Sequence, residues 1–185
     1  MTDKTKSRKN EIIKTAMQLF SEKGYEQTSM RDIAKKMNVS LGLCYRYFDS
    51  KQIIFKEAMN QYVTTCCNQF LKVIDDKQLS FKEKIDRLYD FLANEHAQFS
   101  YQQFFHQIEN EQLHEELSMK ICKFMYPHLL QACNQAISKK EIAVTDPDVL
   151  ISFITYGHVG VLSNCQNHLK SAKLLKQYIY QLLEL

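Results

Sequence analysis

The chain has 185 residues with 24 Lys or Arg, 21 Asp or Glu and a formal net charge of +3, and it contains only four glycines and two prolines. So few turn-forming residues exclude a sheet-rich fold with many tight turns and favour long helices, so we expect an all-α protein. The most apolar stretch, residues 149–162, is short and interrupted by polar side chains, so we expect neither a secretion signal nor a membrane segment.

The positive charge is concentrated near the N-terminus. Residues 1–56 carry twelve Lys or Arg against six Asp or Glu, a charge of +6, so the remaining 129 residues carry −3. This asymmetry favours a polyanionic partner for the N-terminal segment. A solvated basic tail would explain the same charges equally well.

The first two helices are predicted from apolar spacing and capping residues. Apolar residues recur at helical spacing over roughly 6–23, and Gly24 stands where a left-handed cap would end that helix. Ser29 and Asp32 have the spacing of a capping box, which predicts a short second helix over about 29–37. The chain therefore begins with a long helix followed by a short one.

A tight turn and a third short helix follow. Asn38 suits the turn because asparagine tolerates positive φ better than most residues, and Ser40 suits the N-cap of a helix over 41–47. Ser50 is placed to cap a fourth helix, running from Lys51 toward Val73. Two short helices joined by a tight turn and supported by a longer helix form a helix-turn-helix.

The segment from Thr28 to Lys51 closely resembles the N-terminal signature of the TetR family of bacterial transcriptional regulators. The resemblance covers about the first 60 residues. The elements that match in order and spacing are Phe20, Gly24, Thr28, Ile33, Ala34, Val39, Ser40, Gly42, Tyr45, Tyr47, Phe48, Ser50 and Lys51.

The resemblance implies two domains. Residues 1–50 would form a three-helix DNA-binding domain, and residues 51–185 a larger helical domain for effector binding and dimerisation, with about nine helices in all. The implied function is that of a homodimeric repressor, which a small-molecule effector releases from a pseudo-palindromic operator in double-stranded DNA.

Two groups of residues are predicted to contact DNA. Hydroxyl and basic side chains near helix ends suit phosphate oxygens, and the phosphate-binding candidates are Thr28, Arg31, Tyr45, Tyr47 and Lys51. The third helix would enter the major groove, and the base-reading candidates are Ser40, Leu41, Gly42, Leu43 and Arg46. A solvated surface role would also explain each of these residues taken alone.

Three positions depart from the family pattern. Asn38 stands where the family usually has Gly, and asparagine also tolerates the turn conformation. Cys44 stands where the family usually has Leu, and a buried cysteine also acts as a small apolar group. Leu43 stands where Thr or another small residue is common. An apolar side chain there would contact a thymine methyl, so base preference cannot be transferred from relatives.

The rest of the chain continues as helices. Asp146 and Asp148 flank Pro147 in a typical helix start, and Pro127 falls inside a helical pattern that it should bend. The predicted helices cover residues 81–95, 98–113, 117–138, 147–165 and 171–183.

The last two helices are predicted to form the dimer interface, because small residues let a partner helix approach and an apolar stripe follows them. The predicted interface residues are Gly157, Gly160, Leu175, Tyr178, Ile179 and Leu182. Ordinary core packing in a monomer would explain the same stripe.

Aromatic residues in the middle of the chain are predicted to line the pocket of a largely apolar or aromatic effector. The pocket candidates are Phe99, Phe104, Phe105, Phe124, Tyr126, Phe153 and Tyr156. Core packing accounts for these aromatics equally well, so the effector class stays open at this stage.

No metal, cofactor or enzymatic activity is expected. His106 and Glu109 lie one helical turn apart near other histidines and glutamates, but helix-surface polarity explains them better than a metal site. No catalytic or nucleotide-binding motif is present, and the six cysteines form no Cys-x-x-Cys pair, as in reduced cytoplasmic proteins. A small-molecule or metal sensor that acts through protein contacts is the alternative to a DNA-binding regulator.

Overall fold

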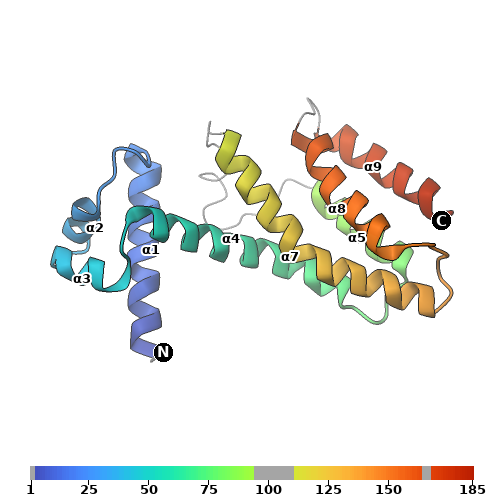
Figure 1. Cartoon of the computed structure of the whole chain (residues 1–185), viewed down its shortest axis with the longest axis horizontal. Coiled ribbons are helices and arrows are strands. Elements are labelled where there is room, and N and C mark those ends of the chain that lie inside the picture. The colour runs from blue at the N-terminus through green and yellow to red at the C-terminus, as the bar shows by residue number, and fades with distance from the viewer. Residues whose placement is uncertain (1–2, 94–110, 164–167) are drawn as a thin grey trace. The chain divides into compact units, whose positions relative to one another are not determined.

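The computed structural model describes residues 3–93, 111–163 and 168–185, and every regular element in these ranges is a helix. The all-α prediction is therefore confirmed. The predicted helix over 98–113 falls largely outside the described residues. The helices are α1 (Asp3–Lys23), α2 (Met30–Lys36), α3 (Leu41–Tyr47), α4 (Lys51–Ile74), α5 (Phe81–Ala93), α7 (Glu111–Ser138), α8 (Pro147–Ser163) and α9 (His168–Leu183) (Figure 1).

The described residues form two compact units, which we call the head (3–62) and the body (63–93, 111–163 and 168–185). Helix α4 begins in the head and continues into the body. The division therefore falls twelve residues later than the predicted boundary at 50/51. The reason is that Ile54, Phe55 and Ala58 of α4 are buried in the head.

The head has a continuous apolar core. Helix α1 contributes residues at helical spacing, and the shorter helices cover them. Phe55 of α4 packs edge-on against Phe20 of α1, with ring centroids 6.1 Å apart. The fully buried large side chains of the head are Ile12, Ile13, Met17, Phe20, Thr28, Ile33, Cys44, Ile54 and Met59.

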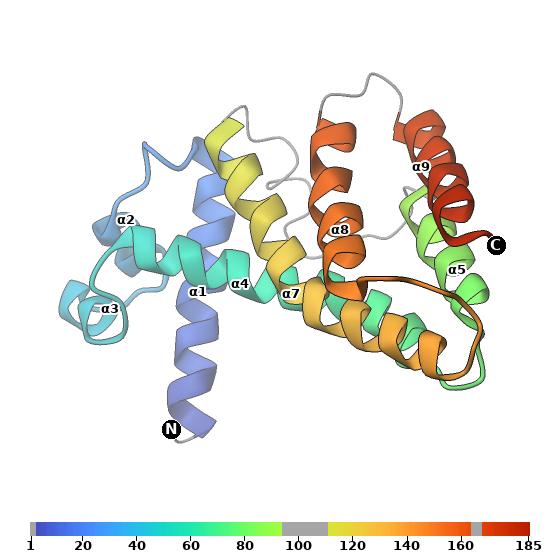
Figure 2. The same cartoon turned by 45° about the vertical axis from the view of Figure 1, so that its right-hand side comes forward.

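The body is a packed set of helices. Helix α8 lies against α7 on one side and α9 on the other, and α5 packs on α9 and α7 (Figure 2). Helix α7 changes direction part-way along its length (Figure 1), and it contains Pro127, as the sequence predicted for a bent helix.

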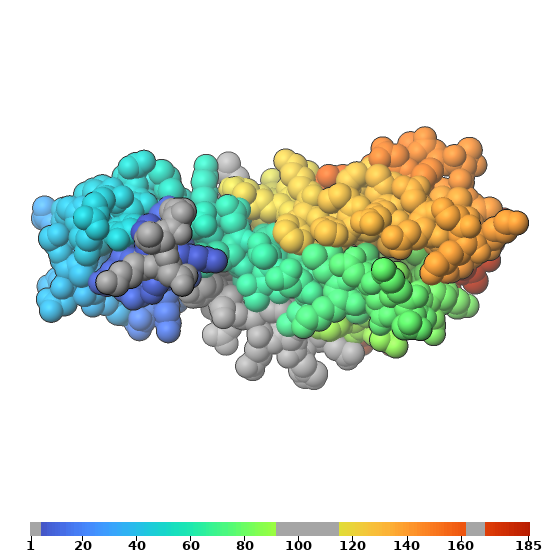
Figure 3. Space-filling model, turned by 90° about the horizontal axis from the view of Figure 1, so that it is seen from below, coloured from blue at the N-terminus to red at the C-terminus, as the bar shows by residue number. Residues whose placement is uncertain are grey.

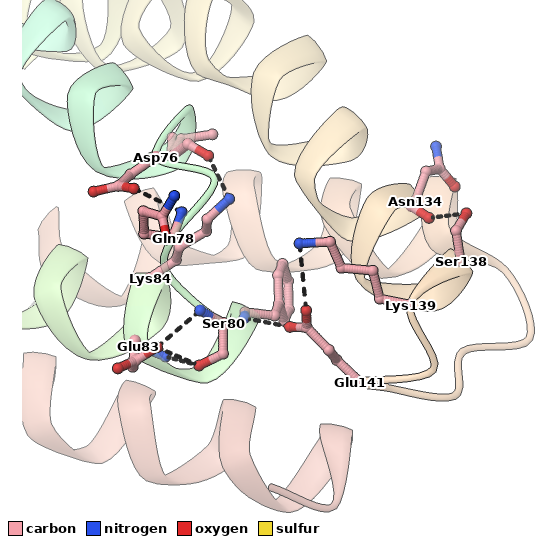
Figure 4. A network of polar contacts seen from close by, with 11 residues as sticks. Asp76, Gln78, Ser80, Glu83, Lys84, Asn134, Ser138, Lys139 and Glu141 are labelled. Atoms are coloured by element: carbon pink, nitrogen blue, oxygen red, sulfur yellow. Dashed lines mark hydrogen bonds and ion pairs between the residues drawn. The ribbon is translucent and has the colours of Figure 1, made fainter.

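The turn between α4 and α5 is fixed by polar contacts (Figure 4). The buried Lys84 ammonium donates to the backbone oxygen of Ile74, 2.7 Å away, and so satisfies a carbonyl at the end of α4. Ser80 caps α5, since its hydroxyl accepts from the Glu83 amide at 3.3 Å. A carboxylate oxygen of Glu141 accepts from the Phe81 amide at 2.6 Å, which ties α5 to the loop after α7.

The described cysteines are free thiols inside the protein. Cys44, Cys66, Cys67, Cys122 and Cys133 are all buried. Burial, with the nearby Cys66 and Cys122, raises the pKa of the Cys67 thiol to about 12. These residues therefore act as small apolar groups, as expected from the sequence. Among the described helices, none combines the length and hydropathy needed to cross a bilayer.

Candidate functional site

Helix α3 presents a small, open face to solvent. Cys44 is fully buried against the head core, which places Gly42 and Arg46 on the opposite side of the helix. A Cβ atom added to Gly42 would meet nothing within 4 Å. Tyr45, beside them, has 48% of its surface exposed. This face can therefore approach another molecule closely without any rearrangement of the head.

The position of α3 is set by local backbone chemistry. The Asn38 φ angle is +54°, the conformation predicted for the turn residue, and the Val39 amide donates to the Ala34 oxygen at 3.0 Å. The Ser40 side chain then caps α3 by accepting from the Leu43 amide at 3.2 Å. Both predicted features, the asparagine turn and the serine cap, are confirmed.

A capping box fixes the start of α2, and two ion pairs link α2 to α1. Ser29 and Asp32 cap each other reciprocally, as predicted. Asp32 also lies 2.9 Å from the Lys23 ammonium, and Lys36 lies 2.7 Å from Glu22. The bond from Ser29, with that from Lys23, holds the pKa of Asp32 well below its usual range. Glu22 of α1 and Asp32 of α2 are therefore paired with lysines of the head.

Three cations of the helix-turn-helix are left without a carboxylate. Arg31, Lys35 and Arg46 are exposed, and none lies within ion-pair distance of an acidic group in the described part of the chain. The Arg46 guanidinium instead lies 5.4 Å from the Tyr47 ring centroid. Lys35 was not among the sequence candidates. Its spacing of four residues from Arg31, on the same flank of α2, is the signal that identifies it.

Two predicted phosphate ligands donate hydrogen bonds to backbone oxygens within the head. Thr28 is only 2% exposed, and its hydroxyl donates to the Gly24 oxygen at 2.8 Å. The Lys51 ammonium donates to the backbone oxygens of Tyr25 and Glu26, at 2.8 and 3.2 Å. In this structure both side chains close the loop between α1 and α2, so their contacts do not support the two phosphate assignments.

The remaining predicted contacts lie at the surface. Tyr45, Gly42, Ser40, Arg31 and Arg46 are exposed. Leu41, Leu43 and Tyr47 are half-buried at the edges of α3. The base-reading candidates and Tyr45 therefore lie on α3 or at its N-cap, and Arg31 lies on α2.

An exposed apolar surface covers one side of α8 and α9, and we call it the α8–α9 face. Phe153 of α8 is 66% exposed, and Tyr178 of α9 is 57% exposed. Both helices present these residues at intervals of three or four, which defines a stripe on each helix. The members of the face are Val149, Phe153, Tyr156, Gly157, Gly160 and Val161 on α8 and Leu174, Tyr178 and Leu182 on α9.

Two predictions for the body need correction. Ile179 is 6% exposed and packs in the core of its own chain, which does not support it as an interface residue, while Leu175 is half-buried. Phe153 and Tyr156 lie on the outer side of α8, so they do not enclose a pocket. Helical spacing shows which residues share a face, but it does not show which face packs inward.

The other pocket candidates do not converge either. Phe124 stacks on His128, with ring centroids 5.9 Å apart, and the Tyr126 hydroxyl lies 2.5 Å from a carboxylate oxygen of Asp148. Of the described candidates, only Tyr126 lines the groove of about 950 Å³ along α7, whose other walls include Lys77 and Lys139. Figure 3 shows the segments that bear these lysines, green and orange, side by side. Phe99, Phe104 and Phe105 lie outside the described residues.

His106 and Glu109 fall outside the described residues. Within the part of the chain that the structure describes, no group of three or more His, Cys, Asp or Glu side chains is placed to hold a metal ion.

The N-terminal part of the chain is similar in sequence to known regulators. Residues 12–58 match the family model described as "Bacterial regulatory proteins, tetR family". The biofilm operon icaADBC HTH-type negative transcriptional regulator IcaR of Staphylococcus aureus (strain Newman) is 40% identical over 85 residues. That match covers 45% of this chain and 43% of the relative, so the chain spans less than half the length of this relative.

Solved structures match nearly the whole chain in fold. A TetR/AcrR regulator from Thermobifida fusca has a TM-score of 0.64 at 21% identity, covering 92% of this chain and 93% of that chain. A regulator from Saccharomonospora viridis, solved in complex with choline, has a TM-score of 0.58 at 18% identity, covering 97% of this chain and 96% of that one. The N-terminal segment is therefore similar in sequence to the tetR family of bacterial regulatory proteins. The chain as a whole has the fold of the solved TetR/AcrR regulator.

Proposed function

We propose that the chain is a homodimeric transcriptional repressor, which binds a pseudo-palindromic operator and releases it when a small molecule binds the body. The observation that carries the proposal is the outer face of the helix-turn-helix. There α3 exposes Gly42 with open space above it, and the cations Arg31, Lys35 and Arg46 have no carboxylate partner among the described residues.

This arrangement suits the major groove of DNA. Gly42 lets the α3 backbone approach the base edges, and Arg46 can donate two hydrogen bonds to a guanine or bind a phosphate. Arg31 and Lys35 lie four residues apart on one flank of α2, where they suit backbone phosphates. Tyr45 adds an exposed hydroxyl on the same side. Leu43 is the candidate for apolar contact with a thymine methyl.

Dimerisation through the α8–α9 face would give the protein two heads. The face is apolar and exposed, and monomeric proteins rarely leave so many large apolar residues together in water. A two-fold dimer presents two copies of α3, which suits half-sites about 34–36 Å apart on one side of the duplex.

Two parts of the proposal, repression and release by a small molecule, are supported by similar proteins. The Staphylococcus aureus relative is named a negative transcriptional regulator, and the Saccharomonospora viridis protein of the same fold was solved with choline. For this chain we propose the same direction of control. A bound small molecule would favour a body conformation in which the two heads no longer match the spacing of the operator half-sites.

The test is a titration of fluorescently labelled DNA from upstream of the chain's own reading frame. We expect specific binding with a stoichiometry of two chains per site, and an affinity that falls steeply as salt rises. A scrambled duplex of the same length is the control. Equal affinity for both duplexes, or binding that does not depend on salt, would contradict the proposal.

A further inference from the structure

Two polar atoms inside the body have no hydrogen-bond partner among the described residues. They are the hydroxyl oxygen of Thr155 and the Nε2 atom of His158, both on α8. The two residues are three apart and therefore share one face of the helix. This face is opposite to Phe153 and points into the body, since Thr155 is only 7% exposed and Ile151 on the same side is 3% exposed.

The surroundings of the pair are neutral. The Tyr89 hydroxyl of α5 lies 3.3 Å from His158 Nδ1, and the two rings stack with centroids 5.4 Å apart. The Cys122 thiol of α7 donates to the backbone oxygen of Thr155 at 3.3 Å. The groups that bond to these two residues are thus an uncharged phenol and an uncharged thiol, from two different helices.

This arrangement leaves two unpaired hydrogen-bonding groups on one face of α8. Because Tyr89 occupies Nδ1, whichever ring nitrogen carries the proton, Nε2 has one donor or one acceptor to offer. The Thr155 hydroxyl can donate and accept. Buried polar groups in folded proteins are almost always paired, so two unpaired ones on one face indicate a site that a bound molecule completes.

Resting on the repressor function proposed above, we infer that Thr155 and His158 form the polar anchor of the effector site. The effector is then an uncharged molecule, with an apolar body and one hydroxyl or carbonyl group that bonds to these two side chains. Tyr89 positions the imidazole.

The electrostatics of the pair support an uncharged ligand. Burial lowers the pKa of His158 to about 4, so the imidazole is neutral at physiological pH and offers a carboxylate no opposite charge. The buried Tyr89 has its pKa raised by burial, so it stays a neutral phenol as well. A charged ligand would lose its hydration here without gaining an opposite charge.

The first arm of the test needs no ligand. In Thr155→Val the unpaired hydroxyl is replaced by a methyl group of the same shape, so the melting temperature of the full-length variant should stay the same or rise. Thr145→Val, at an exposed position before α8, is the matched control. A clear fall in melting temperature for Thr155→Val alone would mean that the hydroxyl already has a structural partner, and it would overturn the inference.

The second arm uses phenol, toluene and benzoate as probes of full-length protein by calorimetry and thermal shift. Phenol should bind and raise the melting temperature, toluene should bind more weakly, and benzoate should have no effect. Thr155→Val and His158→Phe should each weaken phenol binding by about tenfold and leave toluene binding unchanged, while Thr145→Val behaves as wild type. Equal binding of phenol and toluene, or no stabilisation by phenol, would overturn the inference.

The two proposals fail separately. Calorimetry reports the anchor whether or not the head binds DNA, so phenol binding that depends on Thr155, without any operator binding, would remove only the repressor function. Operator binding with no difference among the three probes would remove only the anchor. If both hold, phenol should lower operator affinity for wild type and not for Thr155→Val.

Discussion

The Lys51 ammonium lies 2.8 Å from the backbone oxygen of Tyr25 and 4.4 Å from the centroid of the Tyr25 ring. Lys51 is the first residue of α4, and Tyr25 lies in the loop between α1 and α2. The contact therefore connects the start of the helix that leads to the body with the loop that positions the helix-turn-helix.

The first prediction concerns Lys51→Met, which keeps much of the stem and removes the ammonium. Because charged hydrogen bonds to two backbone oxygens, one of them part-buried, are lost, the free energy of unfolding should fall by about 1–2 kcal/mol. The dependence of DNA affinity on salt should keep its slope, since Lys51 is not a phosphate contact in this account. Urea unfolding and a salt series of DNA titrations measure the two effects. Unchanged stability with a shallower slope would restore Lys51 as a phosphate ligand.

The second prediction concerns Arg31→Ala and Lys35→Ala. Each substitution should reduce the slope of log affinity against log salt by about 1 and weaken binding to all sequences alike, because a phosphate contact is lost. Lys173→Ala, at an exposed position on α9, makes the same charge change away from the head. If Lys173→Ala has the same effect, net charge and not contact explains the result.

A third prediction tests the α8–α9 face. Phe153→Glu and Tyr178→Glu should each give monomers at concentrations where wild type is a dimer, because a carboxylate would be buried at the interface. Analytical ultracentrifugation measures the change, and Lys173→Glu serves as the control for added acidic charge. Since both residues are exposed in one chain, monomer stability should hardly change. Dimers that persist in both variants would place the interface elsewhere.

The fourth prediction follows from the buried imidazole of His158, whose pKa is lowered by burial to about 4. The unfolded chain takes up a proton at this position below about pH 6.5, and the folded chain does so only near pH 4. Stability is therefore full above pH 6.5 and falls as the pH drops toward 4, by about 3 kcal/mol in total. Wild type should lose more stability than His158→Gln between pH 7 and pH 4.5 in urea unfolding. Parallel losses would show that His158 is accessible to protons in the folded state.

The sequence predicted the head well because its signals are local. Helix α3 begins and ends at the predicted residues, since Ser40 fixes its start through a bond to a backbone amide three residues away. Gly24 takes positive φ because it has no Cβ atom, and Asn38 because its short polar side chain tolerates that conformation.

Side-chain roles that depend on distant partners could not be predicted in the same way. Thr28 and Lys51 look like phosphate ligands until the loop at Gly24–Glu26 accepts their hydrogen bonds. The apolar stripes of α8 and α9 were recognised, but Phe153 faces outward and Ile179 inward because of how α5, α7, α8 and α9 pack. Thr155 and His158 gave no sequence signal, since only packing shows that their polar atoms lack partners.

The central claim is that the outer face of α3 enters the major groove, and Gly42→Ala tests it most directly. A Cβ there meets no atom within 4 Å, so the substitution should raise the free energy of unfolding by about 0.5–1 kcal/mol through helix propensity. The same methyl group would stand between α3 and the base edges, so operator affinity should fall by about tenfold or more. A variant that is more stable and binds the operator as tightly as wild type would contradict the claim.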